Sequence, residues 1–254
     1  SYPNTDWFKE TLKPWSPQTY ANATIDGGTD NMTYFVSVSA KTQDGFYRNS
    51  GTKYNQYDLK SNLDLKLNKY INLFMNLTGR MEDRKYPTRS SENIFRMLMR
   101  SKPNMPAYWP NGLPGPDIEF GDNPVVIATD ATGYERVKRY ILNGDFGVPY
   151  VEGLTLKATA SLDKNFRFRK IWQTPWTLYS WDGTSMDENN NPLLVEGKKG
   201  FSDPRLRESM EDNQNILLSG IINYNRTFAE NHSVNVLAGA ERIPGKGDSF
   251  EAFR

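Results

Sequence analysis

The sequence contains no cysteine and only one histidine, His232, among its 254 residues. The absence of cysteine excludes a disulfide framework, a thiolate metal site and a cysteine nucleophile. His232 has no serine or carboxylate at a recognisable motif spacing, so neither a catalytic triad nor a histidine metal site is indicated. The sequence therefore predicts no catalytic residue, no metal ligand and no cofactor, and we do not expect an enzyme.

Long apolar runs and a strong net charge are also missing. No stretch approaches the roughly 18 consecutive apolar residues that a transmembrane helix needs. The net charge of +1 gives no electrostatic footprint for nucleic acid. Glycine pairs such as Gly27-Gly28 do not lead from a strand into a helix, as phosphate-binding loops must. The 30 acidic residues leave room for a glycosidase carboxylate pair, but no spacing selects one.

What the sequence does contain is alternation of apolar and polar residues, clearest in segment 57–67. Alternate side chains of a strand point to opposite faces. One face here is apolar and the other charged: Tyr57, Leu59, Leu63, Leu65 and Leu67 against Asp58, Lys60, Asn62, Asp64 and Lys66. The pattern recurs in 71–81, 154–162 and 234–240. It is typical of a membrane barrel wall, with lipid outside and a wet lumen inside, and equally of a soluble sheet with one solvated face.

Alternation and turn residues predict eight strands, at 17–26, 32–43, 53–67, 70–83, 134–149, 153–168, 211–227 and 232–243. Tight turns alternate with longer segments, which follow Gln43, Asp83, Arg167 and Glu241. Outer-membrane barrels have short periplasmic turns and long extracellular loops. The predicted fold class is therefore all-β: a section of an antiparallel transmembrane β-barrel with long extracellular loops.

The parity of the strands predicts how this section is oriented. The first strand would run inward to the tight turn at Gly27, which places residues 1–16 outside the cell. Since barrel chains enter from the periplasm, an odd number of strands would then precede Ser1. The first and last strands would carry unpaired edges, which lipid does not tolerate. We therefore expect the chain to be part of a larger barrel.

The two longest connections hold the candidate binding residues. Segment 84–133 predicts a short helix with Ser91 as its N-cap, followed by a proline-rich, packed loop. Rigid aromatic rings beside carboxylates can stack on sugar faces, but they can also form a loop's own small core. The residues proposed to contact a ligand are Tyr108, Trp109 and Trp181, with Asp117, Glu119 and Asp122 as nearby acceptors.

Segment 187–191, Asp-Glu-Asn-Asn-Asn, carries oxygen ligands that suit calcium. Its spacing lacks the regular pattern of a calcium-binding loop, so a polar turn tip is the favoured interpretation.

Several short motifs occur in one order along the chain, most densely in residues 4–83. They are Asn4-Thr5-Asp6-Trp7, Ser16-Pro17-Gln18, Gly27-Gly28-Thr29-Asp30, Tyr34-Phe35-Val36-Ser37, Gln43-Asp44-Gly45 and 57–64, followed later by 223–228 and 237–241. In these motifs the chain resembles the SusC/RagA family of TonB-linked outer-membrane proteins, in the region after the plug domain and first barrel strand.

The resemblance implies a plugged barrel of about 22 strands that imports large nutrients, oligosaccharides or peptides, across the outer membrane of a Gram-negative bacterium. It also implies a SusD-like surface lipoprotein as a lid and TonB as the energy source. Residues 1–254 would form part of one barrel domain in the lipid bilayer, with the plug, the TonB-contacting segment and the remaining strands outside this chain. A soluble carbohydrate-binding or adhesion β-sheet protein is the alternative, and an enzyme embedded in a barrel is a third reading.

Overall fold

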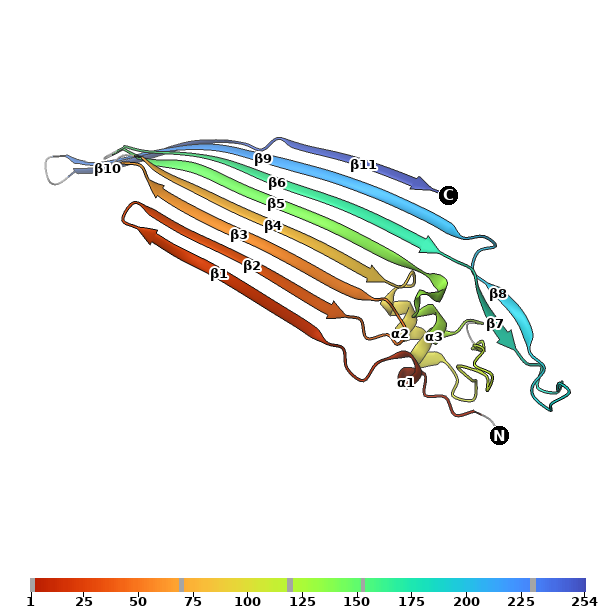
Figure 1. Cartoon of the computed structure of the whole chain (residues 1–254). Helices are drawn as coiled ribbons and strands as arrows, with labels where there is room; N and C mark the ends of the chain where they lie inside the picture. The colour runs from red at the N-terminus through yellow and green to blue at the C-terminus, as the bar shows by residue number, and fades with distance from the viewer. Residues whose placement is uncertain (1–2, 69–70, 118–120, 152–153, 229–231) are drawn as a thin grey trace.

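The structure is a computed structural model that describes residues 3–68, 71–117, 121–151, 154–228 and 232–254. One antiparallel sheet of nine strands dominates it, in the order β1-β2-β3-β4-β5-β6-β9-β10, with β11 also paired to β9 (Figure 1). Its strands are β1 Gln18–Thr29, β2 Met32–Asp44, β3 Lys53–Lys66, β4 Asn72–Tyr86, β5 Gly133–Val151, β6 Leu154–Gln173, β9 Arg205–Phe228, β10 His232–Arg242 and β11 Gly245–Phe253. This confirms the all-β, antiparallel prediction.

The last strand position is divided between β10 and β11, which pair with successive halves of β9. Pro244 lies in the break and has no N–H to donate, but its carbonyl accepts from the Ile216 N–H at 3.0 Å. The sheet therefore has eight strand positions, as predicted. The expected longer connection after Glu241 is wrong, because the ladder resumes at Gly245.

Several strands extend further than the apolar alternation predicted. β4 runs to Tyr86, β6 to Gln173, and β9 begins at Arg205. These extensions are charged on both faces, which hides the alternation in the sequence. Cross-strand ion pairs replace apolar contacts there, for example between Lys170 and Glu208 at 3.1 Å.

The strand register gives the sheet two chemically distinct faces. Residues directly opposite each other share a face. Tyr57 lies opposite Met81, Met81 opposite Tyr140, and Tyr140 opposite Phe166, so apolar side chains of four strands line one side, the apolar face. On the other side, the charged face, Arg80 Nε donates to Asp58 Oδ1 at 2.6 Å. The two-faced prediction for 57–66 is confirmed.

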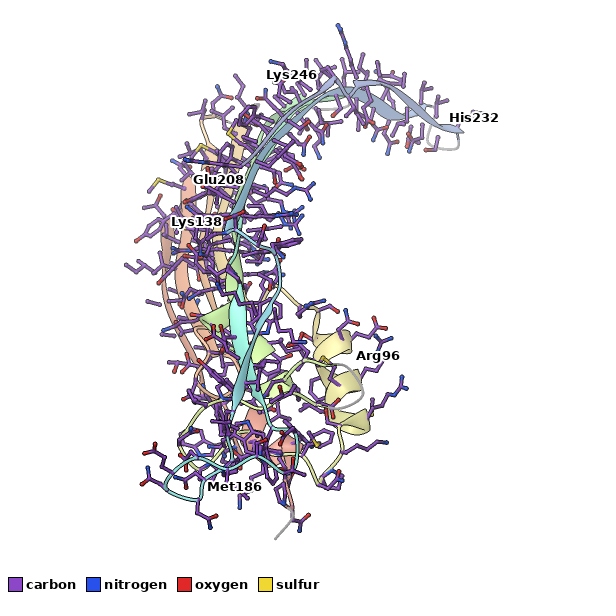
Figure 2. The ribbon with its side chains drawn as sticks, turned by 90° about the vertical axis from the view of Figure 1, so that its right-hand side faces the viewer. Arg96, Lys138, Met186, Glu208, His232 and Lys246 are labelled. Atoms are coloured by element: carbon purple, nitrogen blue, oxygen red, sulfur yellow. The ribbon has the colours of Figure 1, made fainter. Side chains whose placement is uncertain are left out.

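The helices gather at one end of the sheet, on its concave side (Figures 1 and 2). They are α1 Trp7–Thr11, α2 Ser91–Arg100, α3 Pro124–Ile127 and the 3₁₀ turn η1 Asp130–Thr132. Ser90 at the start of α2 lines a hollow of ≈ 330 Å³ together with Tyr86 and Glu135. Glu135 lies on the charged face, where its carboxylate contacts Tyr86 and Arg169. Because the helices pack on the side of Glu135, the charged face is the concave one. Among the described residues, no helix is long and apolar enough to cross a membrane.

The N-cap of α2 is Ser90, whose Oγ accepts from the Asn93 N–H at 3.3 Å. The prediction of Ser91 was therefore wrong by one residue, since both serines precede the same apolar spacing. The helix itself was placed correctly, and Ile94, Met97 and Leu98 are buried.

A small core holds these loops together and confirms that segment 84–133 is packed. Its buried members come from α1, the β2–β3 connection and the β4–β5 connection: Trp7, Tyr47, Ile94, Met97, Leu98, Ala107, Val125, Ile127 and Ala128. The β6–β9 connection contributes Trp176 to its edge. That connection carries a hairpin of its own, β7 Trp176–Ser180 paired with β8 Val195–Lys199, which the sequence did not predict.

Candidate functional site

The two long connections meet through the tryptophans that the sequence singled out. Trp109 and Trp181 contact edge to face, with ring centroids 6.4 Å apart and planes at 82°. Trp109 Nε1 donates to the Tyr179 carbonyl at 2.6 Å, and Trp181 Nε1 donates to the Ser185 carbonyl at 2.6 Å. Both indole N–H groups are therefore engaged within the loops, and the pair joins the β4–β5 connection to the β7–β8 hairpin.

Tyr108 lies beside this pair and is 40% exposed. Partial burial raises the pKa of its phenol above the ordinary value, and the nearby carboxylate of Glu10 adds to the effect. The ring stays neutral at physiological pH and can offer a face or a hydroxyl to a ligand. The structure thus brings Tyr108, Trp109 and Trp181 to one end of the molecule. The contact between the two tryptophans is also what the loop-core alternative expected.

Asn123 organises this cluster, and the sequence reading missed it. Its side chain is fully buried. Nδ2 donates to the carbonyls of Ala107 and Gly115, both at 2.8 Å, while Oδ1 accepts from the Val125 and Val126 N–H groups. Asn123 therefore caps α3 and fixes the segment that carries Tyr108. The signal was available, because asparagine followed by proline is typical of an N-cap and first helical residue.

The carboxylates expected beside the aromatic rings are engaged or buried within the loops. Asp122 accepts from Trp176 Nε1 at 3.0 Å and from the Asn123 N–H at 2.9 Å. Asp117 is 1% exposed, and Glu119 lies outside the described residues. Asp117 is therefore buried, and Asp122 is engaged by Trp176 and Asn123 within the loop.

The Asp187–Asn191 segment is a self-capped turn. Asp187 Oδ1 accepts from the N–H groups of Asn189 at 2.9 Å and Asn191 at 2.8 Å. The hydrogen bond from the Asn191 N–H is the main reason that the Asp187 pKa lies below its ordinary value. This geometry is that of a polar turn tip, the favoured interpretation.

Below the loops, the charged face of the sheet carries a network of hydrogen-bonded side chains. Asp58 accepts from Arg80, from Gln56 at 2.6 Å and from Ser39 at 3.1 Å. Nearer the loops, Tyr54 and Arg84 line a shallow depression of ≈ 440 Å³. Such a wall can bind polar molecules through many weak contacts.

No group of three or more His, Asp or Glu side chains in the described part of the chain lies close enough to hold a metal ion. His232 lies at the end of the molecule opposite Met186 of the β7–β8 connection (Figure 2). The histidine is therefore remote from the loop cluster.

Comparisons with known proteins find similar sequences and similar folds. No known family profile matches the chain. A TonB-dependent receptor of Formosa agariphila is 28% identical over 265 residues, covering 100% of this chain and 24% of its own length. A second receptor of that name and organism is 23% identical and covers 93% of the chain. Among solved structures, the RagAB peptide importer in its closed-closed state superposes with a TM-score of 0.72, at 18% identity, over 98% of the chain.

The chain is similar in sequence to TonB-dependent receptors and in fold to the RagAB importer. A second structure, of the RagAB peptide transporter, matches with a TM-score of 0.71 at 20% identity. The chain spans about a quarter of these proteins: 24% of the first receptor, 26% and 27% of the two solved chains. The relatives are named as receptors and importers, and none of those described is named as an enzyme.

Proposed function

We propose that this chain is part of the barrel wall of a TonB-dependent importer in the outer membrane of a Gram-negative bacterium. The observation that carries the proposal is the sequence similarity to a TonB-dependent receptor over the whole chain. Residues 1–254 would belong to a single barrel domain, with the plug and the other strands contributed by the rest of the transporter.

The two faces of the sheet support a position in lipid. On β6 the apolar face runs from Leu154 to Leu162, nine residues, which matches the roughly 9–11 residues of a tilted transmembrane strand. The concave face is charged and suits a wet lumen. The outer strands β1 and β10 end the sheet order, and in lipid their free edges would need partner strands.

The partners we propose are a SusD-like surface lipoprotein over the loop cluster and TonB acting through the plug of the same transporter. The similarity in fold to the RagAB peptide importer supports the first. The loop cluster is the part of this chain that such a lid would approach, because the helices and the β7–β8 hairpin lie together at one end of the sheet (Figure 1).

As cargo we propose an oligosaccharide, bound in part by Tyr108, Trp109 and Trp181. The indole N–H groups of both tryptophans already donate to loop carbonyls, so the ring faces are what remains for a ligand. Ring faces suit the apolar faces of sugars. A peptide is the competing cargo, because the RagAB structures are named as a peptide importer.

Uptake of labelled oligosaccharides and peptides by cells with and without TonB tests this proposal. We expect oligosaccharide uptake that disappears without TonB. Trp109→Ala and Trp181→Ala should each weaken cargo affinity about three- to tenfold while barrel assembly and cargo chemistry stay unchanged. Trp172→Ala, on the apolar face of β6, is the matched control and should bind normally.

Three results would contradict parts of the proposal. Uptake that does not depend on TonB would overturn the transport function. Uptake of peptides alone would overturn the choice of cargo. Unchanged cargo affinity in both tryptophan variants would assign Trp109 and Trp181 to loop packing only.

A further inference from the structure

The apolar face of the sheet is interrupted by a depression of ≈ 380 Å³ over strands β3 to β6. Gly79 on β4 forms its floor, since it lies between Leu59 of β3 and Leu142 of β5 and has no side chain. The walls are mainly apolar side chains from all four strands: Tyr57, Leu59, Met81, Tyr140, Leu142 and Phe166. Its apolar lining would suit a hydrocarbon group.

Two lysines border this depression on its β5–β6 side. Lys164 lines it directly, at the point where the apolar face of β6 stops being aliphatic. Lys138 lies opposite Phe168, and Lys164 lies opposite Leu142, so the two lysines flank the contacting rings of Tyr140 and Phe166. An anionic group near this aromatic pair would be within reach of lysines on both sides.

The local acids do not neutralise these cations completely. Asp83 accepts two hydrogen bonds from Arg136, at 2.9 and 2.6 Å. Lys138 lies opposite Asp83, so two cations share this one carboxylate. Lys164 Nζ lies 2.5 Å from Asp212 Oδ1. Asp248 lies opposite Asp212 and pairs with Lys246 at 3.1 Å. Four cations thus face three carboxylates. Partly exposed ion pairs of this kind contribute little and can exchange partners.

We propose that this depression is a specific site for a phosphorylated lipid of the outer leaflet. One acyl chain would lie over Gly79, and a headgroup phosphate would contact Lys138 and Lys164. The inference rests on the proposed function insofar as it needs the apolar face to lie in the outer membrane. Its energetic basis is packing of the chain against the walls, because lipid gives no hydrophobic drive, together with attraction between lysine and phosphate.

Native mass spectrometry of the delipidated, intact transporter, titrated with purified lipid A, tests the site. Gly79→Leu should fill the floor without strain, because an added Cβ would meet only the Leu59 Cβ at 3.9 Å. We expect about tenfold weaker binding of one lipid A molecule, which is a modest loss of packing. Gly220→Leu is the matched control: Gly220 is on the same face, opposite Ala158, with open space around it. It should bind lipid A as the wild type does.

The headgroup contact is tested by comparing lipid A with its dephosphorylated form. Lys138→Gln should lower the preference for the phosphorylated lipid about fivefold, as expected for one lysine near an anionic headgroup. Arg226→Gln, on the same face at the other end of β9 and opposite Val234, should leave the preference unchanged.

Several outcomes would overturn the site. These are equal lipid A binding by Gly79→Leu and wild type, an equal loss in Gly220→Leu, or no preference for phosphate in the wild type. Cargo uptake, measured on the same variants, should stay at the wild-type level. Loss of TonB dependence in the uptake of the wild type would count against the proposed function and would leave the lipid result standing, so the two failures are distinguishable.

Discussion

At the scale of single residues, the register decides what each substitution costs. Leu63 lies opposite Tyr34 and Met75 on the apolar face, whereas its neighbour Asn62 lies opposite Phe35 and Asn76 on the charged face. We expect Leu63→Arg to cost about 2–4 kcal/mol of barrel stability, since it puts a cation in the lipid. Asn62→Arg should be tolerated. Heat-modified mobility of the barrel in gels measures assembly, and equal tolerance of both variants would contradict the face assignment.

A second prediction for a single residue concerns the stability of the Asp182 turn at low pH. Hydrogen bonds from the Ser185 hydroxyl and from the Ser185 and Thr184 N–H groups lower the pKa of Asp182 to about 2. Because the folded pKa is lowered, the ionised carboxylate stabilises the turn fully above its ordinary value of 3.8, and this stabilisation is lost as the pH falls through about 2. Pepsin should therefore cleave the β7–β8 connection faster at pH 2 than at pH 4. Asp182→Ala should be cleaved quickly at both values, and a wild type cleaved equally at both would refute the idea.

At the scale of elements, α2 depends on its cap. Ser90→Ala removes the acceptor for the Asn93 N–H and should destabilise the helix by about 1 kcal/mol. Amide exchange in 91–100 would then be about fivefold faster. Ser90→Thr keeps the hydroxyl and should exchange like the wild type. Unchanged exchange in Ser90→Ala would show that packing of Ile94 and Leu98 alone holds the helix.

The connections give a topology prediction. The helices and the β7–β8 hairpin lie at one end of the sheet, and the β1–β2 turn lies at the other (Figure 1). The chain has no cysteine, so single cysteines can be introduced without background. In intact cells, an impermeant thiol reagent should label Asn111→Cys and Asn189→Cys and should miss Asp30→Cys. Labelling of Asp30→Cys alone would invert the proposed orientation.

At the scale of the whole molecule, the exposed apolar side chains of one face predict that the protein needs detergent or lipid to stay in solution. Side chains such as Val38, Leu59, Leu156 and Ile222 are each at least 40% exposed on that face. The intact transporter should therefore precipitate when detergent is withdrawn and stay dispersed in lipid nanodiscs, as light scattering would measure. A stable, dispersed protein without either would favour the soluble sheet that the sequence alternation also allowed.

The sequence by itself determined the fold class, the eight strand positions and the two faces. The reason is that alternation of apolar and polar residues depends only on residues within one strand. The sequence also located α2 and the aromatic residues of the long connections. It failed at β11, where Pro244 interrupts the pattern, and in the outer halves of β6 and β9, where charges occupy both faces.

Only the tertiary structure decided which distant residues meet. The contact of Trp109 with Trp181, the hydrogen bonds from Asn123 Nδ2 to the Ala107 and Gly115 carbonyls, and the depression over Gly79 each join segments separated along the chain. No local spacing encodes such contacts, because they depend on how neighbouring strands are registered and how two long connections pack on one core. The same alternation fits a barrel wall and a soluble sheet, and the curvature that makes the charged face concave appears only when all the strands are assembled.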